Sequence, residues 1–374
     1  MEKSLKIASW VLIALLLLPM IQHVTHLLPE RKLKGAVTLA TVPGYSTEHW
    51  LNGTFQDSVE RAFNDRFGFR NMFIRINNQV AYSLYRKALA NGVIIGKDNY
   101  LYEIGYIWSQ NGDNYIGDST IRARAEQIKE LQEYFEQQGK HFVVIFAAGK
   151  GSFYPEYIPD RFAKSTDPAI SSKSTNLDEY ANNFDHIGVN YINFNKWFLE
   201  MKDTSEYSLF PRTGTHWSYY GMVLVIDSLH NYIGDVTGRE LPPIEIGEIE
   251  LSRDYKASDS DIELSMNILF RVNRDMLAYP KIRMVETDID KLRGIVIADS
   301  FYWGLHNLGF SSHVFDKGEF WFYNRLAYSR SFDGRASLDT LNRRERLENA
   351  DVIILMATEA TLPKFPYGIE NVLK

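Results

Sequence analysis

At residues 294–301 the chain reads Gly-Ile-Val-Ile-Ala-Asp-Ser-Phe, an apolar run that ends in two polar side chains. Consecutive small and branched apolar residues are typical of a strand that is buried on both faces, as in a parallel sheet. Chemistry in such sheets lies at the carboxyl ends of the strands, and Ser300 would follow this strand directly. The stretch therefore predicts an α/β fold with a serine at its functional edge.

Three further apolar runs share this pattern, at residues 141–147, 189–194 and 351–357. Segments with apolar residues at helical spacing lie between them, at about 120–138, 176–187 and 219–232. Short buried strands that alternate with helices predict a mainly parallel sheet with helices on both faces. We expect one such domain over residues 91–374.

The segments outside this alternation are less regular. Residues 57–90 have apolar side chains at helical spacing, with a break at Gly68. A short hairpin is predicted at residues 93–103, because two triplets with strand character flank a Lys-Asp-Asn turn. Residues 241–279 are polar and contain prolines, and we predict no element there.

Near the N-terminus, residues 7–28 form an apolar run with basic residues on both sides. Its 22 residues would span about 30 Å of hydrocarbon as a helix. A small-x-small cleavage signal does not follow it, which favours an uncleaved signal anchor over a cleaved signal peptide or a core helix. We expect residues 1–6 in the cytoplasm, residues 29–90 as a juxtamembrane segment, and the body of the chain outside.

Composition excludes several classes of function. The 374 residues carry 41 Lys and Arg against 47 Asp and Glu, a net charge of −6 that argues against nucleic-acid binding. The absence of cysteine excludes thiol nucleophiles, thiolate-bound zinc, iron–sulfur clusters and disulfides. HExxH, Walker and Rossmann glycine patterns are also missing, so we expect neither a metal nor a cofactor.

Ser300 needs a base in order to act as a nucleophile, and histidine is the usual one near neutral pH. His216 lies in the polar segment Arg212–Ser218, directly before a predicted helix. His306 and His313 follow the serine closely and stay as alternatives. The other interpretation of Ser300 is a helix cap.

A second Asp-Ser pair, Asp118-Ser119, follows Gly117 and directly precedes an amphipathic helical pattern. Because a buried strand does not precede this pair, we interpret it as the cap of that helix.

Five segments in the same order resemble motifs of the alginate O-acetyltransferase-like SGNH hydrolase family. They are Phe63–Arg70 (FNDRFGFR), Ile95–Glu103 (IGKDNYLYE), Lys150–Pro159 (KGSFYPEYIP), Gly214–Gly221 (GTHWSYYG) and Ile297–Phe301 (IADSF). The likeness covers most of the chain after the apolar run. It implies an SGNH-hydrolase-like three-layer αβα domain preceded by a single transmembrane helix.

The resemblance implies that Ser300 is the nucleophile and His216 its base. The family's third triad member, an aspartate, falls on Gly214, and losing a triad acid can cost about 10⁴ in rate. Either another carboxylate orients His216, or a Ser–His dyad works slowly, or the chain is a pseudoenzyme. The candidate supporting carboxylates are Asp227, Asp259, Asp261 and Asp299, and sequence spacing does not choose among them. Arg212, Trp217 and Trp303 are expected to contact the substrate.

The resemblance implies a bacterial inner-membrane protein whose periplasmic domain acetylates an exopolysaccharide or cell-envelope glycan through an acyl-Ser300 intermediate. It also implies a partner that donates the acetyl group, a membrane-bound O-acyltransferase. One alternative is a catalytically silent polysaccharide-binding or scaffold subunit, suggested by Gly214 and by the aromatic side chains of Trp303 and residues 321–323. The other is an acetyl esterase, since the same site can use water as its acceptor.

Overall fold

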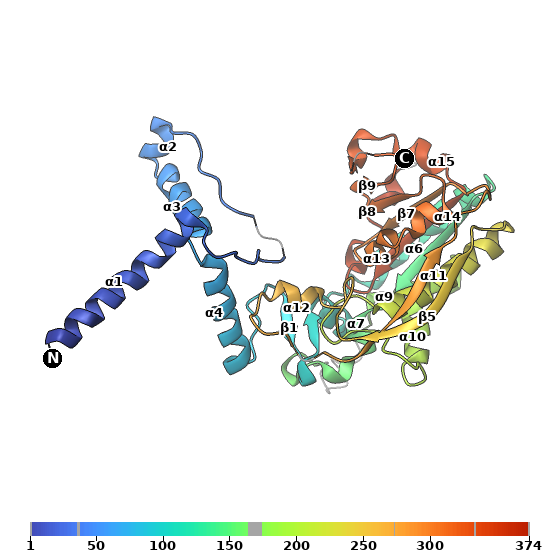
Figure 1. The fold of residues 1–374 in the computed structure, drawn as a ribbon. Helices are drawn as coiled ribbons and strands as arrows, with labels where there is room; N and C mark the ends of the chain where they lie inside the picture. The colour runs from blue at the N-terminus through green and yellow to red at the C-terminus, as the bar shows by residue number, and fades with distance from the viewer. Residues whose placement is uncertain (1, 36–37, 164–173, 273, 333, 373–374) are drawn as a thin grey trace. The chain divides into compact units, whose positions relative to one another are not determined.

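The computed structural model describes residues 2–35, 38–163, 174–272, 274–332 and 334–372 (Figure 1). The chain separates into two compact units. The first comprises Met1–Asn91 together with Glu263–Arg271, and the second comprises Gly92–Ile262 and Val272–Lys374.

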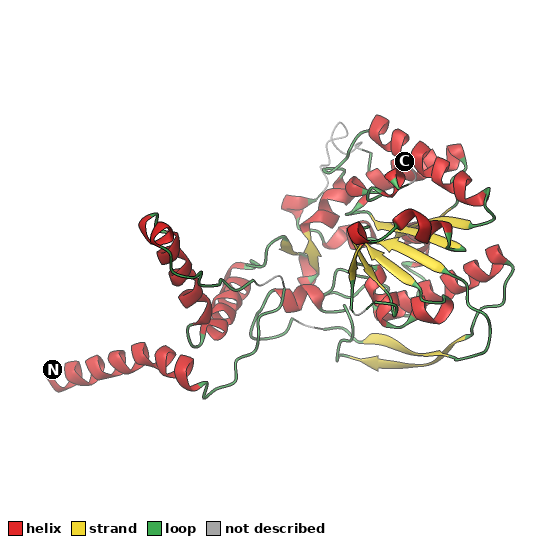
Figure 2. Ribbon diagram, turned by 90° about the horizontal axis from the view of Figure 1, so that it is seen from above, coloured by secondary structure: helices red, strands yellow, loops and turns green. Residues whose placement is uncertain are grey.

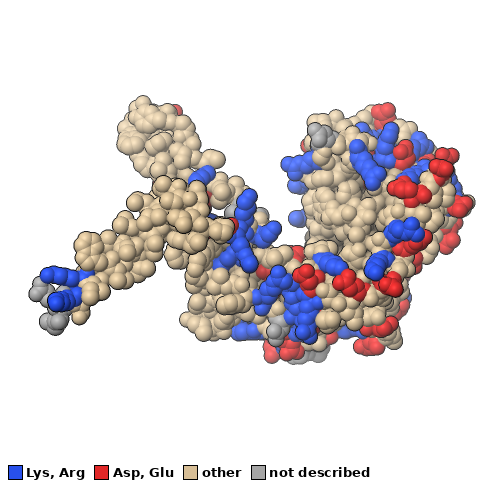
Figure 3. All heavy atoms as spheres, in the orientation of Figure 1, with Lys and Arg blue, Asp and Glu red and all other residues tan. Residues whose placement is uncertain are grey.

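The first unit is helical. Its helices are α1 (Glu2–Thr25), α2 (Thr47–Leu51), α3 (Thr54–Arg66) and α4 (Arg70–Tyr85). The part of α1 from Lys3 to Thr25 is long and apolar enough to cross a membrane, and its apolar side chains are exposed. Figure 3 shows α1 as an uncharged rod with basic side chains at its N-terminal end. The expected apolar N-terminal helix is therefore present.

The predicted helix break at Gly68 is confirmed, since α3 ends at Arg66 and α4 begins at Arg70. A Cβ atom on Gly68 would lie 2.1 Å from the carbonyl oxygen of Pro19, so the glycine allows backbone contact with α1. His23 Nδ1 also lies 2.7 Å from the carbonyl oxygen of Arg66. These contacts join the last turns of α1 to the loop between α3 and α4.

The second unit is built on a seven-stranded sheet in the order β10-β9-β8-β7-β11-β3-β4. In chain order the strands are β3 (His141–Ala147), β4 (Tyr191–Asn193), β7 (Gly294–Ala298), β8 (Glu319–Phe322), β9 (Leu326–Tyr328), β10 (Ala336–Ser337) and β11 (Val352–Thr358). The strands from β8 to β4 are parallel, whereas β9 and β10 pair antiparallel at one edge. The predicted mainly parallel sheet is confirmed, and the four predicted strands are β3, β4, β7 and β11.

Helices cover both faces of this sheet (Figure 2). One face carries α7 (Lys150–Phe153), α10 (Phe194–Met201), α11 (Tyr219–Thr237), α13 (Tyr302–Asn307) and α14 (Phe310–Val314), and the other carries α6 (Asp118–Glu136), α9 (Asn176–Ile187) and α15 (Arg343–Glu348). Alternate strand side chains enter the two cores: Val143 and Ile145 face α11, while Val144 and Phe146 face α6. The unit therefore has the three-layer αβα architecture that the alternating pattern predicts.

Two smaller sheets lie outside this layer arrangement. The predicted hairpin is present as β1 (Val93–Ile95) and β2 (Leu101–Glu103), and it leads into α5 (Ile104–Asn111). An antiparallel ribbon of β5 (Ile244–Ser252) and β6 (Leu277–Met284) was not predicted. Its strand β5 is almost fully exposed, so it lacks the buried apolar run that marks the other strands. The chain between β5 and β6 contributes a residue to the candidate active site.

Candidate active site

Ser300 lies in the turn between β7 and α13, at the carboxyl end of the sheet. Its neighbour Asp299 is buried and holds this turn in place. The Oδ2 atom of Asp299 accepts hydrogen bonds from the backbone N–H of Thr358 (2.8 Å) and from the hydroxyls of Thr358 (2.8 Å) and Thr361 (2.7 Å). Asp299 thus ties the serine turn to the end of β11 and does not hydrogen-bond His216.

His216 lies in the loop before α11 and connects two residues that are distant in sequence. Its Nε2 atom is 3.2 Å from Ser300 Oγ, 84 residues further along the chain. Its Nδ1 atom is 2.5 Å from Oδ2 of Asp261, 45 residues further along. A nucleophile that contacts a base, which is oriented in turn by an acid, is the arrangement of a serine-based triad.

Asp261 is held rigidly at the start of the short helix α12 (Asp261–Ser265). Its Oδ1 atom accepts hydrogen bonds from the backbone N–H of Thr215 (2.8 Å) and of Ile262 (2.6 Å). The second oxygen is thereby left for His216. The bond to Thr215 also joins the carboxylate to the residue that precedes the histidine.

The structure gives a physical reason for the glycine at position 214. A Cβ atom there would lie 2.5 Å from the carbonyl oxygen of Ser258 and 3.0 Å from the carbonyl carbon of Asp259. The backbone that leads to Asp261 therefore occupies the space in which an aspartate at position 214 would begin. The carboxylate that contacts His216 belongs instead to Asp261, in the chain between β5 and β6.

The remaining candidate carboxylates have other surroundings. Asp259 is buried, and its carboxylate accepts hydrogen bonds from the Tyr279 hydroxyl (2.9 Å) and the backbone N–H of Tyr219 (3.2 Å) at the start of α11. Burial raises the pKa of Asp259 to about 7. Asp227 is exposed, well inside α11. Neither is the carboxylate that contacts the imidazole.

Several charges act on His216. Burial alone would lower its pKa, but the charge and hydrogen bond of Asp261, with the charges of Glu103 and Asp299, raise the pKa of His216 above 6.5. Glu103 is the last residue of β2 and is exposed, but partial desolvation of its carboxyl group, followed by the charge of Asp261, raises its own pKa as well. The sequence pattern did not single out Glu103, although it closes the quoted hairpin segment.

Tyr323 is a second residue that sequence reasoning considered only as a possible sugar-stacking ring. Burial raises the pKa of Tyr323, and interactions with the side chain and backbone of Ser300 oppose this rise, so the two residues are close neighbours. Its backbone N–H donates to the carbonyl oxygen of Ala298 (2.9 Å), and its φ of 50° is left-handed. Tyr323 also lines a cavity of about 600 Å³ with Phe322 and Tyr367.

Lys150 forms hydrogen bonds with the backbone of the loop that carries His216. It is fully buried after β3, and its Nζ atom donates to the carbonyl oxygens of Arg212 (2.9 Å) and Gly214 (2.7 Å). Burial lowers the pKa of Lys150 to about 7. The lysine therefore fixes the backbone just before His216, and its signal in the sequence was only the resemblance of the segment that it begins.

Trp217 and Arg212 are two of the three residues that were expected to contact the substrate. Trp217 is a correction: its side chain is only 2% exposed and packs on Phe301, with ring centroids 5.2 Å apart, so it fills the core and does not contact a substrate. The guanidinium of Arg212 pairs with Asp275 (2.9 Å) and lies 4.8 Å from the ring centre of Tyr100.

Trp303 is half-buried, and its ring packs against those of Phe320 and Tyr328, with centroids 4.9 and 4.6 Å away. Trp321, one of the aromatic residues in the silent-binder interpretation, is fully buried. Among the ring side chains considered for sugar stacking, Phe322 and Tyr323 are the ones that line the cavity of about 600 Å³.

The alternative bases are engaged elsewhere. His306 Nδ1 lies 3.4 Å from the hydroxyl of Ser311. His313 is buried, and its Nε2 atom is 3.1 Å from the carbonyl oxygen of Pro242. The predicted cap is wrong in detail: the N-cap of α6 is Gly117, without a side-chain capping bond, and Asp118 and Ser119 are the first two residues of the helix.

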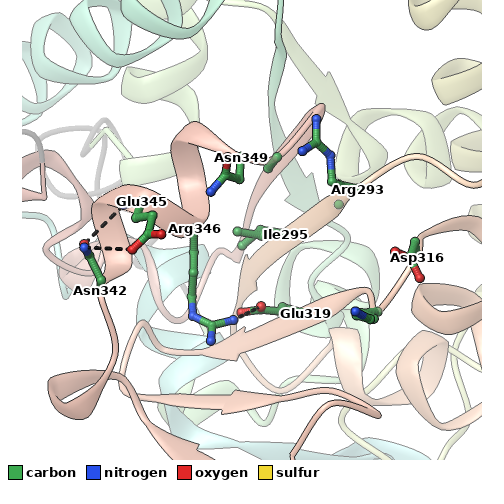
Figure 4. A pocket seen from close by; sticks show the side chains of 11 residues that line it. Arg293, Ile295, Asp316, Glu319, Asn342, Glu345, Arg346 and Asn349 are labelled. Atoms are coloured by element: carbon green, nitrogen blue, oxygen red, sulfur yellow. Dashed lines mark hydrogen bonds and ion pairs between the residues drawn. The ribbon is translucent and has the colours of Figure 1, made fainter.

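Figure 4 shows a different cavity, of about 400 Å³, at the amino end of β7. Its charged side chains form ion pairs, Arg293 with Asp351 (2.9 Å) and Arg346 with Glu319. Neither serine nor histidine is among its lining residues, so it offers no nucleophile–base pair. Within the described ranges, no three His, Asp or Glu side chains are grouped to hold a metal ion.

Comparison with protein families gives one match, over residues 93–243, to "SGNH hydrolase-like domain, acetyltransferase AlgX". The match covers less than half of the chain. It confirms the resemblance and the fold class that the sequence motifs indicated. The matched range contains His216, whereas Asp261 and Ser300 lie beyond it. Comparison with curated proteins gave no match.

Solved structures that are similar to this chain include the following three. The O-acetyltransferase domain of Pseudomonas putida AlgJ is 16% identical, with a TM-score of 0.47 over 73% of this chain and 92% of that one. Pseudomonas aeruginosa AlgX is 14% identical, with a TM-score of 0.40 over 71% and 55%. Bacillus cereus PatB1 is 13% identical, with a TM-score of 0.38 over 66% and 91%.

Proposed function

We propose that the chain is an O-acetyltransferase that carries an acetyl group to a polysaccharide hydroxyl through an acyl-Ser300 intermediate. The observation that carries this proposal is the hydrogen-bonded series Ser300–His216–Asp261 at the carboxyl end of the sheet. The family description, an SGNH hydrolase-like acetyltransferase domain, supports the same reaction class.

In the first half-reaction, Ser300 Oγ attacks the acyl carbonyl of the donor while His216 Nε2 accepts its proton. Asp261 stabilises the resulting imidazolium through Nδ1. The tetrahedral intermediate collapses when the donor's oxygen leaves, and His216 returns the proton to that oxygen. The products are acetyl-Ser300 and the deacylated donor, with the imidazole neutral again.

Charge on the intermediate's oxygen needs hydrogen-bond donors that are already in position. The backbone N–H of Ser300 and the protonated hydroxyl of Tyr323, which interacts with Ser300, are donors of this kind. Burial raises the pKa of Tyr323, so its hydroxyl stays protonated and able to donate at neutral pH. We propose that these two groups bind the oxyanion.

In the second half-reaction, a sugar hydroxyl gives its proton to His216 and attacks the acetyl carbonyl. The bond between the acetyl carbon and Ser300 Oγ then breaks, and His216 returns the proton to Oγ, which leaves the acetylated sugar and free Ser300. We assign the acceptor to the cavity that Tyr323 lines, because Phe322 and Tyr367 also line it and aromatic rings can pack on a sugar. Water at the same position would make the chain an esterase, so the acceptor decides between the two activities.

The test is to incubate the full chain in detergent with p-nitrophenyl acetate and to look for acetylated Ser300 by mass spectrometry. We expect one acetyl group on Ser300, and none in the Ser300→Ala or His216→Ala variants. Acetyl transfer to an added oligosaccharide distinguishes transferase from esterase. A folded chain that never acquires the acetyl group would favour the silent polysaccharide-binding subunit.

We also propose that α1 is a single-pass anchor, that residues 91–374 are a periplasmic catalytic domain, and that a membrane-bound O-acyltransferase supplies the acetyl group. The support is the apolar, exposed α1 and the family resemblance. A phosphatase fused after Lys374 should be active in a bacterial cell. An inactive fusion, with a cytoplasmic reporter active at the same point, would refute the topology.

A further inference from the structure

Helix α3 has an apolar face that the described part of the first unit leaves uncovered. Phe55, Val59 and Phe63 follow one another at intervals of four residues, which puts them on the same side of the helix. Phe63 is 67% exposed and Val59 is 38% exposed, whereas Ala62 on the adjacent side is buried. An amphipathic helix normally turns such a face toward a core or a membrane.

An aromatic cluster extends this face at the N-terminal end of α3. The rings of Tyr45, Trp50 and Phe55 pack on one another with centroids 5.8–6.0 Å apart. Tyr45 is nevertheless 68% exposed, and the neighbouring Leu51 is 79% exposed. On the side of the molecule seen in Figure 3, the region of α2 and α3 shows few charged side chains. Tyrosine and tryptophan are enriched where a protein meets the headgroup region of a bilayer.

The other end of α3 is joined to the end of α1. His23 near the end of α1 contacts the carbonyl oxygen of Arg66, the last residue of α3, and Gly68 packs directly on the backbone at Pro19. A helix of α1's length that crosses the hydrocarbon ends close to the membrane–water interface. The C-terminal end of α3 is therefore held at that level.

The charges of α3 favour apolar over electrostatic attachment. The helix carries Asp57, Glu60 and Asp65 against Arg61 and Arg66, an excess of one negative charge (2 − 3 = −1). A helix without excess positive charge gains nothing from anionic lipids, so its attachment depends on the burial of apolar side chains. The occupant that fits this face is a phospholipid interface, with no requirement for anionic headgroups.

We propose that α2 and α3 lie in the outer interface of the membrane that α1 crosses, with Leu51, Val59 and Phe63 directed toward the acyl chains. The proposal depends on α1 being an anchor and is independent of acetyl transfer. This second attachment would fix the height of the first unit above the membrane, which a single transmembrane helix does not do.

The absence of cysteine from the chain makes a direct test possible. Single cysteines are introduced by Val59→Cys, Phe63→Cys and Leu51→Cys, labelled with a nitroxide, and the full chain is reconstituted in phosphatidylcholine vesicles. Asn64→Cys is the matched control, because Asn64 is exposed and lies one residue beyond Phe63, about 100° around the helix. Leu15→Cys in α1 reports whether the anchor itself is in lipid.

Collisions with oxygen, which concentrates in lipid, are compared with collisions with a water-soluble nickel chelate. We expect the oxygen-to-nickel ratio at positions 51, 59 and 63 to exceed that at position 64 several-fold and to approach that at position 15. Equal nickel accessibility at all of these α2 and α3 positions would overturn the proposal. Low accessibility to both reagents at 59 and 63 would also overturn it, since it would mean that a protein covers the face.

A position 15 that is open to nickel would remove the premise, because α1 would not be in the membrane. Acetylation of Ser300 in the same labelled samples reports the proposed function separately. All three substituted α2 and α3 side chains are exposed, so the replacements remove no core contact, and circular dichroism checks the helix content.

Discussion

Replacing Asp261 with asparagine tests whether this carboxylate orients His216. The asparagine oxygen can still accept from the backbone N–H groups of Thr215 and Ile262, so the side chain should keep its position. Its amide nitrogen would then face His216 Nδ1 and donate to it. The imidazole proton would be held on Nε2, the atom that must accept the Ser300 proton.

The magnitude follows from the distance between the two groups. At an effective dielectric of about 20, unit charges 2.5 Å apart interact by about 332/(20 × 2.5), or roughly 7 kcal/mol. The Asp261 side chain is 30% exposed, so solvent reduces this value. We expect the rate of Ser300 acetylation to fall about 10³-fold, equivalent to about 4 kcal/mol in activation free energy.

The assay is the rate of Ser300 acetylation by an acetyl ester, measured by mass spectrometry on the full chain in detergent. Asp227→Asn makes the same charge change on the exposed side of α11, and it should stay within about twofold of the unaltered chain. Thermal unfolding shows whether each variant keeps its fold. A folded Asp261→Asn variant that retains activity within about threefold would refute the role assigned to Asp261, because that is under 1 kcal/mol.

Three further predictions concern the surroundings of the triad. Gly214→Ala should lower the free energy of unfolding by about 1–3 kcal/mol, because its Cβ would lie 2.5 Å from the Ser258 carbonyl oxygen. The measurement is denaturant unfolding, and the control is Gly234→Ala, whose Cβ would lie 3.6 Å from its nearest neighbour. Acetyl transfer should be lost as the pH falls through the raised pKa of His216, since only the neutral imidazole accepts a proton. Glu103→Gln should move this loss to lower pH, because it removes a charge that favours the protonated imidazole. A pH–rate profile that Glu103→Gln leaves unchanged would show that the two side chains are not coupled. Tyr323→Phe should lower kcat about 10²-fold with little change in KM, as expected for a lost oxyanion donor, whereas a rise in kcat would mean that the tyrosine obstructs the site.

Local patterns were sufficient for the centre of the sheet. The strands β3, β7 and β11 are continuous apolar runs because both of their faces are covered by helices. Helix α9 runs from Asn176 to Ile187, as its apolar spacing predicted. The edge of the sheet was not predicted, because β9 and β10 have only three and two residues, too few for an alternating pattern to emerge.

The exposed ribbon of β5 and β6 was missed for a different reason. Its first strand reads Ile-Glu-Ile-Gly-Glu-Ile-Glu-Leu-Ser and is nearly all exposed, so alternation there was not accompanied by a buried face. The consequence reaches the site, since the chain between the two strands carries Asp261. Without the ribbon there was no basis for bringing Asp261 to the carboxyl end of the sheet.

The sequence by itself determined where Ser300 lies and the kind of sheet around it, because a buried strand and the serine that follows it are local features of one short segment. It also indicated His216 as a candidate base, because this histidine lies in a polar segment directly before a predicted helix. Only the tertiary structure decided among Asp227, Asp259 and Asp261, since the imidazole and its acid are 45 residues apart and are joined by packing across Gly214. The physical reason is that spacing along a chain fixes which side chains share a helix or strand face, whereas the meeting of two loops depends on the backbone contacts between them.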